Sequence, residues 1–435
     1  MCIRDSGYIY RAYYGLPALN NSKGIPTNAV YGFLNMLKKL IKEKNPGYLA
    51  VAFDHKAPSF RKDLYQDYKA TRKPTPDKLI SQILIIKAIM KSYNIPAFEL
   101  KGYEADDILA SLAKNASQKG LPVFIVSSDK DIVQIVDNGI YIYDPKKDMV
   151  FNKSNVKDSF SVEPELFADF LALKGDKTDN IPGIPGIGET MAKDLIEKYG
   201  TVEKIIESTA MMPDKMRSLI ENNKDQLLLS KKLTKLNADI DLDVNLQELR
   251  IKEPNYAELI AKFEELEFDK FTREMLSELN CDLNVKQQIL KNREQLSEII
   301  EGIKRQGVFS FLAGEDSLIL SVNGTLLTLP NHLVFENIDL LNIIFNDKYL
   351  EKVSYQIKDS YKEIKKLGIS IEKPVFDLSI GAYLLNPSWQ KYDLFKIALN
   401  YSKDGLKLAA LLIQRDCSGQ ALNEKAVACY VIDKI

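Results

Sequence analysis

Histidine and cysteine are scarce in this chain, and their scarcity excludes several kinds of site. There are only 2 histidines and 4 cysteines among 435 residues. The cysteines, at positions 2, 281, 417 and 429, have no metal-ligand or redox spacing, which is typical of a protein in a reducing cytoplasm. We therefore expect neither an imidazole-centred mechanism nor a zinc site, and any metal should be a hard cation held by oxygen atoms.

Long hydrophobic runs and a large net charge are also missing. No apolar run reaches about 18 residues and no signal peptide is visible, so we expect a soluble cytoplasmic protein without a membrane partner. We also expect a monomer. The formal net charge of −1 arises because 59 basic residues nearly balance 60 acidic ones. This balance excludes no partner, since basic side chains could still gather on one surface. The length predicts two or three domains.

Among the features that are present, the stretch 102–113 has the most unusual pattern. Its apolar residues recur at helical spacing, and Glu104, Asp106 and Asp107 crowd the first turn of the predicted helix. Carboxylates suit a helix N-terminus, so capping is one interpretation. Three acids in four residues exceed what capping needs, and metal binding is the other interpretation.

Two predicted strands, 49–53 and 121–126, are each followed by acidic residues. Asp54 follows the first strand, and Asp129 and Asp131 follow the second. Strands that alternate with helices at this spacing predict a three-layer α/β domain with a mostly parallel sheet, whose strand ends gather ligands. Taken alone, Asp54 could equally be a turn residue.

A glycine-rich loop at 175–188 precedes a predicted helix at 189–199. Asp176 and Asp179 lie on one side of a turn, and Gly183, Gly186 and Gly188 allow tight turns. Backbone N–H groups at the start of the following helix could hold a phosphate, and Lys193 lies on that helix. This combination predicts binding to the DNA backbone without sequence preference.

The segment 61–73 interleaves tyrosines with lysines and arginines. Its cations would neutralise phosphates, while Tyr65 or Tyr68 stacks on bases or packs underneath. The alternative is a solvated charged helix.

Eight carboxylates from separated stretches could converge only at one edge of the predicted sheet. They are Asp54, Glu104, Asp106, Asp107, Asp129, Asp131, Asp176 and Asp179. Such a cluster needs divalent cations, and ligation by oxygen alone indicates two Mg²⁺ or Mn²⁺ ions. Two such cations would support hydrolysis of a phosphodiester bond, so the residues predict a metal-dependent nuclease.

Six motifs in order resemble the 5′-nuclease domain of bacterial DNA polymerase I, a relative of flap endonucleases. They are Tyr-Arg-Ala (10–12), Phe-Asp-His-Lys-Ala-Pro-Ser-Phe-Arg (53–61), Tyr-Lys-Ala-Thr-Arg (68–72), Gly-Tyr-Glu-Ala-Asp-Asp (102–107), Ser-Asp-Lys-Asp (128–131) and Gly-Asp-Lys-Thr-Asp-Asn-Ile-Pro-Gly (175–183). The resemblance implies a PIN-like α/β fold with a helical arch and a helix–three-turn–helix that takes a potassium ion beside duplex DNA. It also implies action on 5′ flaps, nicked duplex and RNA primers on DNA.

The resemblance also assigns roles by motif position. It implies that Asp54, Glu104, Asp106 and Asp107 hold the more catalytic metal, and that the other four acids hold the second. Arg11, Lys69 and Arg72 match catalytic cations, the last two of them in the arch.

The chain departs from this family at its start and in its second part. The family begins with a central strand that ends in a metal-binding aspartate, and by motif spacing Arg4 stands at that position, with Asp5 one place later. We therefore expect the innermost strand and one ligand to be missing or displaced. The alternative function is then a non-catalytic fragment that binds branched DNA.

Residues after 290 resemble, more weakly, the polymerase's 3′–5′ exonuclease domain, which is RNase H-like. Its expected carboxylates are replaced at 310–312, at Ser360 and at Val431, so this part would be a degenerate, truncated scaffold. The predicted organisation is a catalytic core at 1–165, a helix–three-turn–helix subdomain at 166–280, a linker at 281–291 and the exonuclease-like domain at 292–435.

Overall fold

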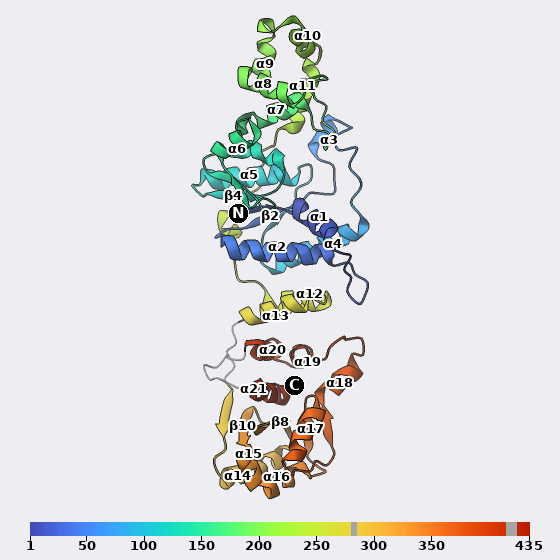
Figure 1. Cartoon of the computed structure of the whole chain (residues 1–435), viewed down its shortest axis with the longest axis vertical. Helices are drawn as coiled ribbons and strands as arrows, with labels where there is room; N and C mark the ends of the chain where they lie inside the picture. The colour runs from blue at the N-terminus through green and yellow to red at the C-terminus, as the bar shows by residue number, and fades with distance from the viewer. Residues whose placement is uncertain (280–284, 415–423) are drawn as a thin grey trace. The chain divides into compact units, whose positions relative to one another are not determined.

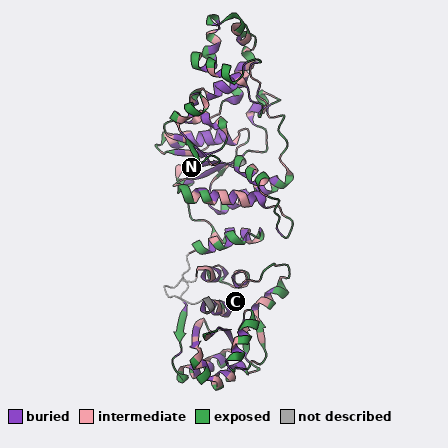
Figure 2. Cartoon of the chain, in the orientation of Figure 1, coloured by how far each residue is buried: buried purple, intermediate pink, exposed green. Residues whose placement is uncertain are grey.

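The computed structural model describes residues 1–279, 285–414 and 424–435, apart from the side chains of residues 5, 6, 424 and 425. These residues form two compact units, Met1–Asn255 and Tyr256–Ile435 (Figure 1). Each unit encloses its own buried core (Figure 2). Within the described ranges, no helix combines the length and apolar character that crossing a membrane requires.

The first unit contains a six-stranded sheet and its covering helices. The strands are β1 (Cys2–Arg4), β2 (Ala50–Ala52), β3 (Ala97–Phe98), β4 (Val123–Val126), β5 (Ile140–Asp144) and β6 (Met149–Phe151). The α-helices are α1 (Asp5–Gly15), α2 (Asn28–Lys44), α3 (Phe60–Leu64), α4 (Asp77–Ser92), α5 (Ala105–Gln118), α6 (Lys153–Phe160), α7 (Phe167–Lys174), α8 (Glu189–Tyr199), α9 (Val202–Glu207), α10 (Asp214–Asn222) and α11 (Lys224–Thr234). The 3-10 helices are η1 (Lys130–Ile135), η2 (Pro164–Leu166), η3 (Thr209–Met211) and η4 (Leu246–Leu249).

The sheet of the first unit is parallel except at one edge. Its strand order is β3-β2-β1-β4-β5-β6, and only β6 pairs antiparallel with its neighbour. Helix α5 packs against β1, β2 and β4 on one face, and α1, α2 and α4 lie on the other side (Figure 1). The expected α/β architecture with a mostly parallel sheet is therefore confirmed.

The central strand, β1, is an element that the sequence alone does not predict. Cys2 pairs with Ala50 and Ile125, and Ile3 pairs with Val51 and Val126. The expectation that the innermost strand is missing is wrong. A three-residue strand with an arginine at its end has little strand pattern of its own, and its conformation depends on hydrogen-bonded partners on both sides.

Most other predicted elements of the first unit occur within a few residues of the expected positions. The predicted strands 49–53 and 121–126 correspond to β2 and β4, and the acidic stretch forms the start of α5. The segment 61–73 differs from a continuous charged helix, because α3 ends at Leu64 and turns follow.

The second unit contains a mixed six-stranded sheet in the order β12-β11-β8-β9-β10-β7. Its strands are β7 (Lys286–Ile289), β8 (Val308–Ala313), β9 (Ser317–Val322), β10 (Thr325–Pro330), β11 (Glu351–Ser354) and β12 (Val375–Asp377). Its helices are α12 (Tyr256–Glu265), α13 (Asp269–Glu278), α14 (Arg293–Gln306), α15 (Asn331–Glu336), α16 (Ile338–Phe345), α17 (Ile357–Lys366), α18 (Leu378–Leu385), α19 (Leu394–Tyr401), α20 (Gly405–Gln414) and α21 (Glu424–Lys434).

The division between the units lies after Asn255, earlier than the expected linker at 281–291, whose residues 281–284 lie outside the described ranges. Helices α12 and α13 therefore belong to the second unit. The side-chain amide of Gln414 donates to the backbone carbonyls of Leu276 and Leu279, which ties the end of α13 to α20. Contacts between residues so distant in sequence leave no local signal that would mark this boundary.

The expected carboxylate positions of the second unit carry uncharged side chains in buried places. Ser310 in β8 is buried, and Val431 in α21 packs in a core with Leu312 and Ile319. The Oγ atom of Ser360 accepts a hydrogen bond of 3.3 Å from the Ala313 backbone N–H. These positions are filled by packing and neutral hydrogen bonds.

Candidate functional site

Three neighbouring strands of the first unit end in charged residues at one edge of the sheet. β1 ends at Arg4, β2 is followed by Asp54, and β4 is followed by the loop that carries Asp129. Because these strands are parallel, their carboxyl ends meet at the same edge. Side chains alternate along a strand, so Arg4 lies on the same face as Cys2, which packs in the core against α5.

Helix α5 begins at this edge with its acidic first turn. Glu104 is the N-cap and forms a reciprocal capping box with Asp107. The Oδ1 atom of Asp54 accepts a hydrogen bond of 2.9 Å from the Ala105 backbone N–H. Capping, one of the two interpretations of this stretch, therefore accounts for Asp107, whereas the side chain of Asp106 is directed to Arg4.

Asp107 forms a buried ion pair with Arg61. The two guanidinium nitrogens of Arg61 donate to the two carboxylate oxygens over 2.7 and 2.8 Å, and the side chains are 2% and 0% exposed. The backbone N–H groups of Asn237 and Glu104 also donate to this carboxylate. Because both oxygens are fully engaged, Asp107 has the contacts of a structural residue and differs from the metal ligand that the resemblance implies.

Arg4 bridges two carboxylates that belong to different elements. Its Nη2 atom lies 2.8 Å from Oδ2 of Asp106, and its Nη1 atom donates to Asp129. Burial lowers the pKa of Arg4, but the charges of Asp106, Asp129 and Asp54 together raise it above its ordinary value. Burial raises the pKa of Asp106 to about 8, although Arg4 acts in the opposite direction. The bridge therefore joins a permanent cation to a strongly desolvated acid.

The loops after β4 and α7 bring further carboxylates to the same place. Asp129 caps η1 by accepting a hydrogen bond of 3.0 Å from the Asp131 backbone N–H. Lys130 Nζ lies 2.9 Å from Oδ2 of Asp176, whose Oδ1 accepts from the Thr178 N–H over 2.7 Å. Burial raises the pKa of Asp131, and the negative charge of Asp129 raises it further.

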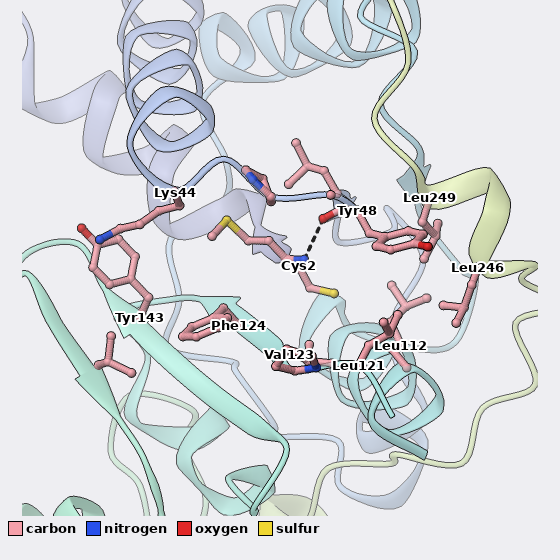
Figure 3. A pocket seen from close by; sticks show the side chains of 17 residues that line it. Cys2, Lys44, Tyr48, Leu112, Leu121, Val123, Phe124, Tyr143, Leu246 and Leu249 are labelled. Atoms are coloured by element: carbon pink, nitrogen blue, oxygen red, sulfur yellow. Dashed lines mark hydrogen bonds between the residues drawn. The ribbon is translucent and has the colours of Figure 1, made fainter. Parts of the chain in front are cut away.

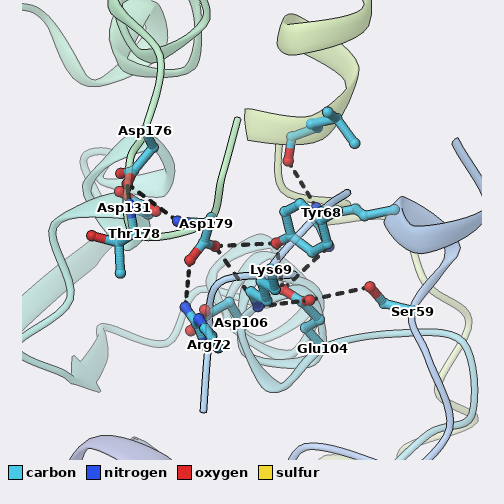
Figure 4. A network of polar contacts seen from close by, with 12 residues as sticks. Ser59, Tyr68, Lys69, Arg72, Glu104, Asp106, Asp131, Asp176, Thr178 and Asp179 are labelled. Atoms are coloured by element: carbon cyan, nitrogen blue, oxygen red, sulfur yellow. Dashed lines mark hydrogen bonds and ion pairs between the residues drawn. The ribbon is translucent and has the colours of Figure 1, made fainter. Parts of the chain in front are cut away.

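Residues 65–73, the segment after α3, supply two cations to the carboxylates (Figure 4). Lys69 Nζ lies 2.7 Å from Oε1 of Glu104 and 3.8 Å from Oδ2 of Asp179. Arg72 pairs with Asp179. Burial raises the pKa of Glu104, but Lys69 and Arg61 lower it by more in sum, so it lies below its ordinary value. Two of the three expected catalytic cations, Lys69 and Arg72, thus lie at the acids themselves.

Tyr68 is buried under this segment. It is 5% exposed, and its hydroxyl lies 3.2 Å from a carboxylate oxygen of Glu104 and 3.2 Å from one of Asp179, between which its single proton is shared. Tyr65 is half-buried and packs against the small cluster that contains Tyr68 and Leu233. For Tyr68 the structure has packing underneath, whereas stacking of the half-buried Tyr65 on a base stays a prediction.

The glycine-rich loop is fastened to the end of α7 by close backbone contact. A Cβ atom at Gly183 would lie 2.4 Å from the carbonyl carbon of Lys174, so only glycine fits there. The side-chain amide of Gln226 donates to the Gly183 carbonyl over 2.5 Å. This fastening holds the turn of Asp176 and Asp179 against the sheet edge.

The end of the same loop leaves backbone accessible at the start of α8. A Cβ atom at Gly186 or Gly188 would meet nothing within 4 Å, and Gly188 is the N-cap of α8. Lys193 lies one turn further on and forms an exposed ion pair of 3.0 Å with Glu189. A phosphate at the start of α8 could meet helix N–H groups there, and Lys193 could reach it by leaving Glu189.

The structure therefore places all eight predicted carboxylates near one edge of the sheet, and the carboxylate of Asp107 is engaged by Arg61. Arg11 is exposed on α1 and lines a small cavity with Arg4 and Ser128. Arg4, Arg61 and Lys130 are partners of these acids that were not assigned a role from the sequence. Arg61 and Lys130 lie inside quoted motifs, which is the signal that could have identified them.

The fit of a metal can be tested on the oxygen atoms that lack a donor. Among the described residues, Oδ1 of Asp106 and Oδ1 of Asp131 are buried without a hydrogen-bond partner. A buried carboxylate oxygen without a donor suits a hard cation. In the part of the chain that the structure describes, however, no three histidine, cysteine or acidic side chains surround one point as ligands of an ion. The donor atoms fit Mg²⁺ or Mn²⁺, but cations of the chain itself bridge them.

An apolar cavity of about 450 Å³ lies where the strands begin rather than where they end. Its lining includes Cys2, Tyr48, Leu112, Val123 and Leu249 (Figure 3). The lining also includes Lys44 and Tyr143 but no aspartate, glutamate or histidine, so the charged edge is the better candidate for a hydrolytic site.

Family models match three parts of the chain. Residues 1–161 match "5′-3′ exonuclease, N-terminal resolvase-like domain", and residues 162–257 match "5′-3′ exonuclease, C-terminal SAM fold". Residues 318–410 match "DNA polymerase I, ribonuclease H-like domain".

Curated relatives extend these matches. A 5′-3′ exonuclease of Aquifex aeolicus (strain VF5) is 45% identical over 270 residues, which cover 62% of this chain and 92% of the relative. A DNA polymerase I of Caldicellulosiruptor bescii is 32% identical over 410 residues, which cover 90% of this chain and 47% of the relative. The chain thus spans about half the length of that polymerase. A structure of T5 D15 protein co-crystallised with metal ions is 20% identical, covers 63% of this chain and 97% of its own, and has a TM-score of 0.48, a similarity too low to bear on the site.

The buried ion pair predicts a large difference between two isosteric substitutions. Asp107→Asn leaves Arg61 as a buried charge without its main partner and should lower the free energy of unfolding by about 3–5 kcal/mol. The matched control, Asp54→Asn, keeps the oxygen that accepts from the Ala105 backbone N–H. It should change the free energy of unfolding by less than about 0.5 kcal/mol. Urea titrations followed by circular dichroism would measure both. Equal unfolding free energies for the two variants would contradict the structural role of Asp107.

Proposed function

The chain belongs to the 5′–3′ exonuclease family, and from this premise we propose that it is a structure-specific 5′ nuclease that hydrolyses DNA phosphodiester bonds with two divalent cations. Its substrates would be 5′ flaps, nicked duplex and RNA primers on DNA. In the whole protein, this activity would serve primer removal and DNA repair within a DNA polymerase I. The observation that carries the proposal is the convergence of acids at one sheet edge, with two buried oxygens that lack a donor.

The acids divide by their origin in the fold into two groups, and the proposal assigns one ion to each. Asp54, Glu104 and Asp106 come from the end of β2 and the start of α5. Asp131, Asp176 and Asp179 come from the loops after β4 and α7, and Asp129 lies between the groups. When bound, Mg²⁺ or Mn²⁺ would supply an activated water and stabilise the leaving oxygen. Asp107 is excluded from the ligands because Arg61 and two backbone N–H groups occupy its oxygens.

The cations of the 65–73 segment would exchange partners when substrate binds. Lys69 and Arg72 pair with Glu104 and Asp179 in the absence of DNA. A phosphate at the edge offers them an anion of equal or greater charge, so they would turn from the acids to the scissile phosphate. The start of α8 and Lys193 would hold the duplex backbone at a distance from the acids.

A second candidate function is a non-catalytic binder of branched DNA. The observation that favours it is Arg4, whose guanidinium lies between Asp106 and Asp129. A chain of this kind would keep the duplex-binding surface at α8 and lose hydrolysis.

Cleavage of a labelled 5′ flap separates the two candidates. We expect Mg²⁺-dependent release of the flap, and its loss in Asp131→Asn, because that substitution removes a carboxylate without touching a phosphate contact. Asp158→Asn, in exposed α6, is the matched control and should cleave as the wild type does. Flap affinity, measured in Ca²⁺, should be the same in all three proteins. Binding without cleavage in the wild type would overturn the nuclease proposal and support the binder.

Two lysine substitutions should affect different steps. Lys69→Ala should slow cleavage of bound flap on the order of 10²-fold, because a cation at the reacting phosphate stabilises charge that develops in the transition state. Lys193→Ala should instead weaken duplex binding and reduce the salt slope by about 1. Single-turnover rates and titrations at several salt concentrations measure the two effects. The same assay in Na⁺ and in K⁺ tests the potassium ion, which should strengthen duplex binding. Equal effects of both substitutions on binding alone would refute this division of roles.

The second unit should show no 3′–5′ exonuclease activity with any divalent ion. Its expected carboxylate positions hold Ser310, Ser360 and Val431 in packed surroundings, so no metal pair can form there. The test uses the full chain with Asp131→Asn, which silences the proposed 5′ nuclease, and single-stranded DNA labelled at its 5′ end, in Mg²⁺ and Mn²⁺. A ladder shortened from the 3′ end that disappears with EDTA and copurifies with the protein would overturn the scaffold proposal.

A further inference from the structure

Arg4 differs from Arg72 and Lys130, two other cations of the acidic edge, in how it is held; Arg61 is buried as well, but it pairs with Asp107. It ends the central strand β1, which pairs with β2 and β4, and its side chain is 10% exposed. The side chains of Arg72 and Lys130 are 43% and 45% exposed and lie on turns or at the start of a short helix. Arg72 and Lys130 can therefore turn toward solvent, whereas the guanidinium of Arg4 lies buried between its two acids.

The place that Arg4 occupies joins the two groups of acids. Asp106 belongs to the first turn of α5 and Asp129 to the loop after β4, and both contact the same guanidinium. Two carboxylates held this close repel each other unless positive charge lies between them. A bound divalent cation would supply that positive charge. In this chain the guanidinium of Arg4, which is part of the protein, supplies it.

Arg4 does not satisfy all the hydrogen-bonding groups around it, as expected of a side chain that stands in place of an ion. Among the described residues, Nε of Arg4 and Oδ1 of Asp106 are both buried without hydrogen-bond partners. A guanidinium has five donors in a fixed plane and cannot turn them all toward two carboxylates on either side. Oδ1 of Asp106 thus stays available to an ion, and the Nε–H of Arg4 is buried without an acceptor.

We propose that Arg4 is a tethered counter-cation that takes the position of a divalent ion between Asp106 and Asp129. The acidic edge of this chain is then assembled without metal, and it binds one divalent ion at Asp131, Asp176 and Asp179 more tightly than any ion beside Asp106. The inference rests on the proposed function for the identity of the edge as a metal site.

The test is direct measurement of Mn²⁺ binding without DNA, by calorimetry and by the electron paramagnetic resonance signal of free Mn²⁺. Arg4→Gln removes the charge and keeps a polar side chain, Arg4→Lys keeps the charge, and Arg250→Gln changes an exposed arginine outside the edge. We expect one tight ion in the wild type, in Arg4→Lys and in Arg250→Gln. Arg4→Gln should bind a further ion, with an affinity at least about tenfold above that of any weak second site in the wild type.

Thermal unfolding gives a second readout. In EDTA, Arg4→Gln should unfold at a lower temperature than the wild type, and Mn²⁺ should restore most of the loss, because the ion replaces the missing charge. The wild type should respond to EDTA much less. Failure of Arg4→Gln to fold in EDTA with folding in Mn²⁺ also supports the proposal.

Several results would overturn the inference, and they differ from those that would overturn the proposed function. Tight binding of two Mn²⁺ ions by the wild type would show that Arg4 does not block an ion site beside Asp106. This measurement needs no variant. Identical isotherms for the wild type and Arg4→Gln would do the same. No Mn²⁺ binding by any of the proteins would instead remove the metal site itself and with it the proposed function. Ion binding as expected without flap cleavage would leave the inference standing and favour the DNA binder.

Discussion

Mutual repulsion among eight carboxylates is the constraint on which the acidic edge depends. Parallel strands and the start of α5 deliver these acids to one place, and burial makes their ionisation still more costly. Cations from several neighbouring elements balance this charge. Arg4 comes from β1, Arg61 from α3, Lys69 and Arg72 from the segment after it, and Lys130 from η1. The packing of that segment onto the sheet edge is a consequence of this charge balance.

The carboxylates could be predicted from the sequence because each is marked by a local pattern. A buried strand followed by an acid, as at Asp54, and a helix with an acidic first turn, as at Glu104, are both readable within about ten residues. Parallel strands then require these ends to meet. The fold class and the order of motifs follow from the same local signals, and the family matches agree with them.

The partners of the acids could not be predicted, because they are chosen by contacts between distant residues. Asp107 meets Arg61, 46 positions earlier, and nothing beside Asp107 distinguishes it from Asp106. Tyr68 could equally face solvent or the core, and burial between Glu104 and Asp179 decides this only in the folded unit. β1 is the clearest case, since its conformation depends on neighbours on both sides.

The position of β1 also bears on how the first unit forms during synthesis. It is the first strand of the chain but the central one of its sheet, and its partners end at Ala52 and Val126. A ribosome that adds roughly 5–20 residues per second needs on the order of ten seconds to deliver the second partner after the first strand has left. During that time the nascent segment has one free hydrogen-bonding side and an uncompensated arginine. The guanidinium of Arg4 therefore stays hydrated until Asp106 and Asp129 have been synthesised and can pair with it.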